Sequence, residues 1–240
     1  MGRNSGYIGV PVAAYDHDPA VLALKEWQVA VGALLAGELG YLARKGGIHE
    51  PGNLFLRDAA RFWLFPTYEH QFEYVDEGIE SLKEPWATRL TESRVRHRDA
   101  DDAERLGVGV HTPTDIPIAG YVETIGVHEF WTGESIAALT DMGVWTQAFV
   151  EARLKWKPRQ PLTVFRLRAF RLAESLSVPA DQVEKKCYSW LELPFALADH
   201  TGEPVPYPGA DALHARCDEL ANAPEEKAAG LQRRVQMVSS

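Results

Sequence analysis

The segment Arg44-Lys45-Gly46-Gly47-Ile48 places two cations directly before two glycines. A backbone without Cβ atoms can approach a ligand closely, and its N–H groups, together with neighbouring cations, can hold an anionic oxygen. The pattern predicts a contact with a phosphate group or a nucleic-acid backbone. The alternative is a strand end followed by a glycine turn with solvated charges. The sequence lacks the full phosphate-loop pattern that ends in Gly-Lys-Ser or Gly-Lys-Thr.

A carboxylate and an imidazole are adjacent at Glu69-His70, at the start of a predicted helix. His70 is a candidate acid, base or metal ligand, and Glu26 would complete the site from the first helix. If Arg44 and Lys45 hold an anion, these residues would form the active site of an enzyme that acts on a phosphorylated or nucleotide-like substrate by phosphodiester or phosphate chemistry. A divalent metal is possible at such a site. The alternative is structural, because helix starts favour acidic residues through the helix dipole.

Positive charge is concentrated between residues 153 and 171, which carry seven Lys and Arg side chains and no Asp or Glu in a chain of formal net charge -9. Cations neutralise phosphates, and an aromatic ring offers a face on which a base can stack. The segment therefore predicts a nucleic-acid contact. Alternatively, its arginines pair with acidic side chains across a sheet and its tryptophan packs in the core. The predicted basic belt comprises Arg153, Trp156, Lys157, Arg166 and Arg168.

Other site patterns are absent or weak. The sequence has no His-Glu-x-x-His zinc pattern and no Gly-x-Ser-x-Gly nucleophile elbow. Glu184 and Lys186 have the Glu-x-Lys spacing of some nucleases, but the preceding acid, Asp181, is too close to lie on a separate strand. Cys187 and Cys217 are predicted to be reduced thiols. No cofactor is identified.

The elements that position these residues form an α+β pattern. A helix is predicted after Pro19, because apolar residues recur at helical spacing as far as Leu35, and Gly37 is expected to end it. A second helix is predicted from Ser135, with Trp145 and Phe149 on one face. Strand composition occurs at residues 41–44, 60–65, 118–127, 162–172 and 187–193.

The composition is that of a globular chain with one main core, since 45% of its 240 residues are hydrophobic and 25% are charged. We expect an irregular lead-in at 1–18, a single α+β domain at 19–200 with a charged excursion at about 88–106, and a C-terminal helix with a polar tail at 201–240. No apolar stretch approaches the roughly 20 residues of a membrane span, and the start lacks a secretory layout. A cytoplasmic location is predicted.

Short motifs follow one another along the chain: Leu24-Lys25-Glu26-Trp27, Arg44 to Ile48, Leu64-Phe65-Pro66-Thr67 with His70-Gln71, Trp145-Thr146, Trp156-Lys157-Pro158 and Ser189-Trp190. Together, from about Leu22 to Leu193, they resemble the bacterial family catalogued as domain of unknown function 1802. The resemblance implies no particular chemistry, because no activity defines that family. The charged excursion and the segment after Pro204 lie outside the resemblance.

The order of predicted helices and strands is also similar to that of the PUA-like barrels, including the ASCH group, which are often associated with RNA. This resemblance rests on order and hydropathy, without a shared motif. It implies a mixed or mostly antiparallel sheet, or a partly open barrel, flanked by helices.

The leading prediction is a module that binds nucleic acid, RNA or a single strand, through the basic belt and Arg44-Lys45. The alternative is the phosphate enzyme described above. A protein-interaction scaffold is a third possibility, which an exposed face of Trp145 and Phe149 would favour. The sequence predicts no oligomeric state.

Overall fold

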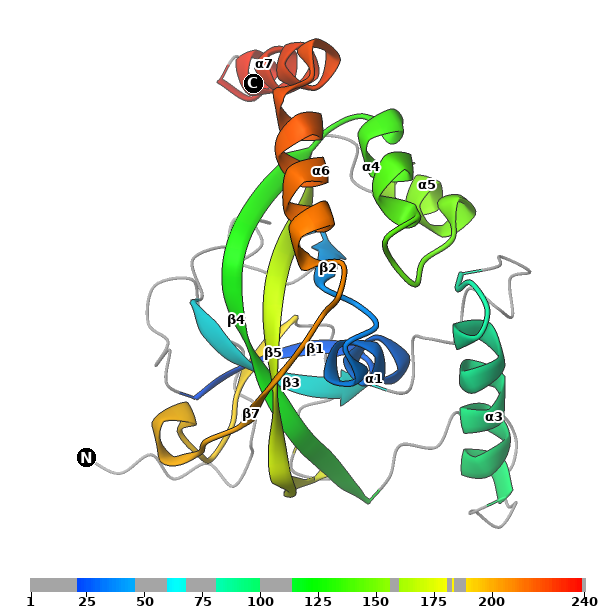
Figure 1. Ribbon diagram of the computed structural model, residues 1–240, viewed down its shortest axis with the longest axis vertical. Helices are drawn as coiled ribbons and strands as arrows, with labels where there is room; N and C mark the ends of the chain where they lie inside the picture. Colours follow the sequence, from blue (N-terminus) through cyan, green and yellow to red (C-terminus); the bar gives the residue numbers. More distant parts are fainter. Residues whose placement is uncertain are drawn as a thin grey trace.

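A computed structural model describes residues 21–45, 60–67, 81–99, 114–155, 160–180, 183 and 189–238, with backbone only at 93–99 and 233–238. Two long strands, β4 and β5, run through the centre of the molecule, and helices lie around them (Figure 1). None of the described helices is long and apolar enough to cross a membrane.

Seven strands form one sheet in the order β2-β5-β4-β3-β1-β6, with β7 pairing to β5 outside this path. The β1–β3 pair is parallel and the other described pairs are antiparallel. The predicted α+β class with a mixed, mostly antiparallel sheet is thus confirmed. The strands are β1 (Leu22–Trp27), β2 (Tyr41–Arg44), β3 (Arg61–Thr67), β4 (Asp115–Phe130), β5 (Leu162–Pro179), β6 (Trp190–Glu192) and β7 (Glu203–Val205).

The sheet is open but strongly curved. The β4–β5 ladder has register shifts at Ile118/Gly120 and at Thr124/Gly126, and such bulges increase local twist. Strands β2 and β1 are separated by three strands in the order, yet an Arg44 nitrogen of β2 lies 3.1 Å from a Glu26 oxygen of β1. The curved sheet therefore brings its β2 edge back to β1, the strand next to its other edge, as in the predicted partly open barrel.

The predicted first helix is wrong in its first half. Residues 22–27 form β1, and helix α1 (Gln28–Ala36) begins only at Gln28. Both faces of β1 are buried, because Leu22 and Leu24 pack in one hydrophobic core and Ala23 packs in another. A strand buried on both faces lacks the apolar–polar alternation that distinguishes a strand from a buried helix. The predicted stop is confirmed, since Gly37 has a left-handed φ of 72°.

The remaining helices are α3 (Trp86–Asp99), α4 (Gly133–Thr140), α5 (Gln147–Lys155), α6 (Ala210–Asn222) and α7 (Pro224–Val238), with a short 3-10 turn at Leu197–Asp199. The single helix predicted from Ser135 is two helices. They are separated by a connection in which Trp145 bridges to Leu82. The segment 201–240, predicted as a helix and polar tail, contains β7, α6 and α7.

The main core fills the space between the sheet and α1, α4, α5 and α6. It includes Trp145 and Phe149, each only 5% exposed, so the exposed aromatic face that would favour an interaction scaffold is absent. A smaller core lies around Trp63 on another face of the sheet. There Trp63 contacts Tyr121, Phe195 and His200 edge-on, with ring centroids 5.3–5.7 Å apart.

Candidate anion-binding site

Arg44 and Lys45 lie at the end of β2 and contact other segments of the chain. The Arg44 guanidinium donates to Glu26 Oε2 at 3.1 Å, and Glu26 Oε1 accepts from the backbone N–H of Trp27 at 2.8 Å. Lys45 Nζ donates to the Leu154 carbonyl oxygen at 2.9 Å, at the end of α5, where a cation also meets the negative end of the helix dipole. We call Glu26, Arg44 and Lys45 the strand-end cluster.

The strand-end cluster is largely removed from solvent. Glu26 is 4% exposed and Lys45 is 5% exposed, while the Arg44 side chain is 12% exposed. A buried carboxylate with a cation partner is usually held for structure, because removing one partner leaves an uncompensated buried charge. The sequence predicted these three as catalytic or anion-binding residues. The structure pairs Arg44 with Glu26, and it places the Lys45 ammonium on the backbone of α5.

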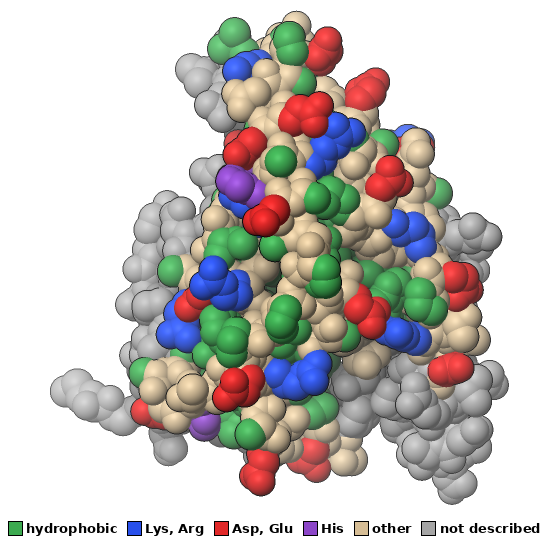
Figure 2. Space-filling view, viewed as in Figure 1, with side chains coloured by type: hydrophobic (Ala, Val, Ile, Leu, Met, Phe, Trp, Pro, Cys, Tyr) green, Lys and Arg blue, Asp and Glu red, His purple; other side chains and the backbone are tan. Residues whose placement is uncertain are grey.

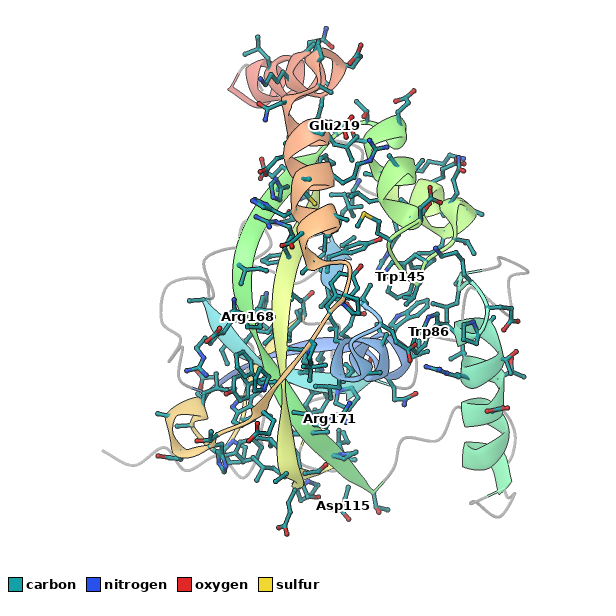
Figure 3. All side chains as sticks on the ribbon, in the orientation of Figure 1. Trp86, Asp115, Trp145, Arg168, Arg171 and Glu219 are labelled. Carbon is teal, nitrogen blue, oxygen red and sulfur yellow. The ribbon has the colours of Figure 1, made fainter. Side chains whose placement is uncertain are left out.

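The described members of the basic belt contact different elements. Arg153, on α5, lies over the Phe149 ring at 5.5 Å. Arg166 is 8% exposed and donates from Nε to His128 Nε2 at 3.2 Å. The Arg168 side chain is 58% exposed. In Figure 3, Arg168 and Trp145 lie on opposite sides of the β4–β5 strands, and Figure 2 shows basic and acidic side chains interspersed over this face. The three described members of the belt therefore differ in their contacts and in their exposure.

Strand geometry explains this division. Side chains alternate between the two faces of a strand, so Arg44 turns inward from β2 toward β1, whereas Arg166, opposite Tyr41 in the ladder, turns to the outer face. Arg166 and Arg168 share that outer face, as their spacing predicts. They differ in exposure because Arg166 lies beneath α6 and Arg168 does not.

Arg168 belongs to a row of three charges across neighbouring strands. Glu123 on β4 lies opposite Arg61 on β3 and opposite Arg168 on β5. Arg61 Nε is 3.3 Å from Glu123 Oε1, and Arg168 Nη1 is 3.6 Å from Glu123 Oε2. We call these three residues the arginine row. Two guanidinium groups share one carboxylate, so the row carries one positive charge in excess.

The arginine row adjoins aromatic side chains. Tyr121 and Phe170 lie two residues from Glu123 and Arg168, with no intervening register shift, so they occupy the same face. Their rings stack with centroids 4.9 Å apart and 9° between planes. The Arg61 guanidinium lies over the Tyr121 ring at 4.9 Å, a cation–π contact. The row is thus a cationic surface beside a partly buried aromatic pair.

Several predicted site residues lie outside the described residues. These are Gly46, Gly47, Ile48, Glu69, His70, Trp156 and Lys157. Among the residues that the structure does describe, no three His, Cys, Asp or Glu side chains come together as a metal site would require.

Two members of the arginine row, Arg61 and Glu123, did not enter the sequence prediction. The available signal was alternation, because Arg61 comes two positions before Trp63 in a predicted strand and Glu123 comes two after Tyr121. His128, which accepts from Arg166, was recognised only as a strand boundary. Its burial and the neighbouring guanidinium lower its pKa below the usual value.

A family model described as "Domain of unknown function (DUF1802)" matches residues 23–210. No curated protein matches the chain. Among solved structures, the chain is similar to a point mutant of the ASCH protein from Zymomonas mobilis, with 11% identity, a TM-score of 0.34, and coverage of 72% of this chain and 79% of that one. It is also similar to ASCH from Zymomonas mobilis, with 12% identity, a TM-score of 0.32, and coverage of 69% and 77%. No function follows from likenesses at these scores.

Proposed function

The chain belongs to the family described as Domain of unknown function (DUF1802), and because that description names no activity, we propose from the chain's own residues that it binds single-stranded nucleic acid. The proposed interface is the outer face of β3, β4 and β5, centred on the arginine row. The observation that carries the proposal is that two exposed arginines on the strands flanking β4 share a single glutamate.

Exposure and charge support this choice. The side chains of Arg61 and Arg168 are 45% and 58% exposed, so their guanidinium groups reach solvent while they contact Glu123. A phosphate can therefore bind without breaking a buried ion pair. Exposed ion pairs contribute only about 0–1 kcal/mol, so Glu123 holds the arginines weakly.

The aromatic neighbours suit a single strand. Phe170 is partly exposed and stacks on Tyr121 beside the row. Unpaired bases stack on aromatic side chains in many single-strand-binding proteins, whereas a duplex hides its base faces. A cationic row beside an aromatic pair thus favours a single strand, RNA or DNA, over a duplex.

The phosphate-enzyme alternative depends on Glu69 and His70, which lie outside the described residues, and it stays a prediction. Glu26, its third candidate, already accepts from Arg44 and from the Trp27 N–H. No contact among the described residues favours catalysis over binding.

Fluorescence anisotropy tests the proposal with labelled RNA and DNA single strands of about 10 nucleotides, within the usual site size, and with the matching duplex. Titrations at roughly 50 and 200 mM salt give the log-log salt slope. The wild type should prefer the single strands. The double variant Arg61→Ala plus Arg168→Ala should bind more weakly, with a slope smaller by about 1.4, because each contacted phosphate contributes about 0.7.

The matched control is Arg89→Ala plus Arg216→Ala. These arginines are also 45% and 38% exposed, and each pairs with one glutamate elsewhere on the surface, so the net charge changes equally. If both double variants bound the single strand equally weakly, binding would depend on net charge alone. That result would contradict the arginine row as the interface. Absence of binding at the lower salt would overturn the proposed function.

A further inference from the structure

Helix α6 covers part of the face that carries the arginine row, and α7 continues from its end. Helix α6 lies along the upper part of β4 and β5, and α7 crosses its end (Figure 1). Leu213 and Cys217 of α6 are buried in the main core. The family match ends at residue 210, where α6 begins, so both helices are additional to the matched domain.

Arg166 lies beneath α6 and continues the arginine row. It is two residues from Arg168 on β5 and opposite Gly126 on β4. A Cβ atom at Gly126 would lie 2.3 Å from Arg166 Nη2, so the glycine leaves the space that the guanidinium occupies. Arg166 Nε donates to His128, and Asp218 of α6 comes within 3.9 Å of the same imidazole. A third arginine of this face is thus present but covered.

Helix α7 carries a buried carboxylate that contacts the segment before α4. Glu226 is 3% exposed and accepts from the Trp131 N–H, from the Thr132 N–H at 3.3 Å and from the Thr132 hydroxyl at 2.7 Å. These donors precede α4, whose N-terminus favours an anion. One turn later, Gly230 packs against the Trp131 ring. Glu226, in the first turn of α7, therefore fastens the junction of α6 and α7 to the loop that follows β4.

The covering helices are acidic on balance. Across residues 210–238 the two helices carry five Asp or Glu side chains and four Arg or Lys, and α6 by itself, at residues 210–222, carries three and one. Asp218 faces the Arg166–His128 pair. A negatively charged element thus lies over the cationic face where an anionic ligand would otherwise bind.

We propose that α6–α7 is an autoinhibitory cover, fastened by Glu226, which excludes single-stranded nucleic acid from Arg166 and limits binding to the exposed arginine row. This inference rests on the proposed function. A ligand that binds only the uncovered state has its apparent affinity reduced by the fraction of molecules in that state. Loosening the fastening raises that fraction and adds Arg166 to the interface.

The test uses full-length Glu226→Gln, with Glu225→Gln as the control. Glu225 is the neighbouring residue of α7 but is exposed, so the control makes the same charge change without touching the fastening. Glu226→Gln should raise the affinity for a labelled single strand by roughly tenfold, which corresponds to about 1.4 kcal/mol, and should speed amide hydrogen exchange in α6 and α7. Glu225→Gln should do neither.

Arg166→Gln provides the specific readout. In the wild-type background it should leave affinity nearly unchanged, because Arg166 is covered, whereas in the Glu226→Gln background it should abolish the gain. Unchanged affinity in Glu226→Gln, with wild-type binding intact, would overturn the cover and leave the proposed function standing. A gain that survives Arg166→Gln would also overturn it. If neither the wild type nor any variant bound the single strand, both the proposed function and the autoinhibitory cover would be overturned.

Discussion

The strand-end cluster and the arginine row contain the same kinds of side chain in opposite settings. In the first, Glu26 is buried, Arg44 is mostly buried, and their ion pair joins β2 to β1 across the curved sheet. In the second, Arg61 and Arg168 reach solvent on either side of Glu123. Charge type alone therefore does not identify a binding surface. The two regions differ in the free energy that is needed to separate each charge from its partner.

The largest expected effect is in the strand-end cluster. Arg44→Met should lower the free energy of unfolding by about 3–5 kcal/mol, because it leaves the Glu26 carboxylate buried without its cation. Urea denaturation measures this. The matched change Arg61→Met in the arginine row should cost under about 1 kcal/mol. Similar losses in both variants would remove the distinction between the two regions.

The next effect concerns Gly126, between the arginine row and α6. Gly126→Ala should destabilise the protein by about 1.5–3 kcal/mol, because the methyl group displaces the Arg166 guanidinium from His128 and strands a charged donor. The control is Gly32→Ala on α1, where a Cβ meets no atom within 4 Å, so stability should be unchanged or higher. Tolerance of both substitutions would show that Arg166 has room to move.

A smaller effect is the pH dependence that His128 contributes. Burial lowers the pKa of His128 most, and Arg166 lowers it further. Asp218 raises the pKa, and His214 lowers it. As the pH falls below about 6.5, the unfolded chain therefore takes up the proton before the native chain does. Stability should fall with decreasing pH by at most about 1.4 kcal/mol per pH unit from this group. Urea unfolding of wild type and His128→Asn across this range isolates the contribution, and parallel curves would exclude it.

The smallest effect is at the centre of the arginine row. Glu123→Gln should tighten single-strand binding about two- to fivefold, under about 1 kcal/mol, because the carboxylate that competes with a phosphate is removed. Anisotropy titration at low salt measures the change. Weaker binding would mean that Glu123 orients the arginines for the ligand rather than competing with it.

Much of the fold was readable from local pattern. The β5 segment was predicted because Phe165 and Leu167 alternate with Arg166 and Arg168, and Gly37 marked the end of α1. Strand β1 was missed because hydrophobic cores cover both of its faces, which removes the alternation that distinguishes a strand from a helix.

The candidate site was less readable, since it depends on contacts between distant segments. No local pattern links Glu26 to Arg44, or His128 to Asp218. The alternation rule correctly placed Arg166 and Arg168 on one face, but only the position of α6 determines that one is buried and the other exposed. Exposure is a property of the packed chain, and sequence spacing does not contain it.

The position of β1 also bears on how the chain acquires its structure. Its register pairs Leu24 with Leu64 on one side and with Trp190 on the other, so the first described strand gains its second neighbour only from a segment near the opposite end of the chain. Contacts of such high sequence separation slow folding. During synthesis, one edge of β1 would stay unpaired until β6 has been made. Early folding intermediates would therefore expose this strand edge, which favours aggregation or chaperone binding.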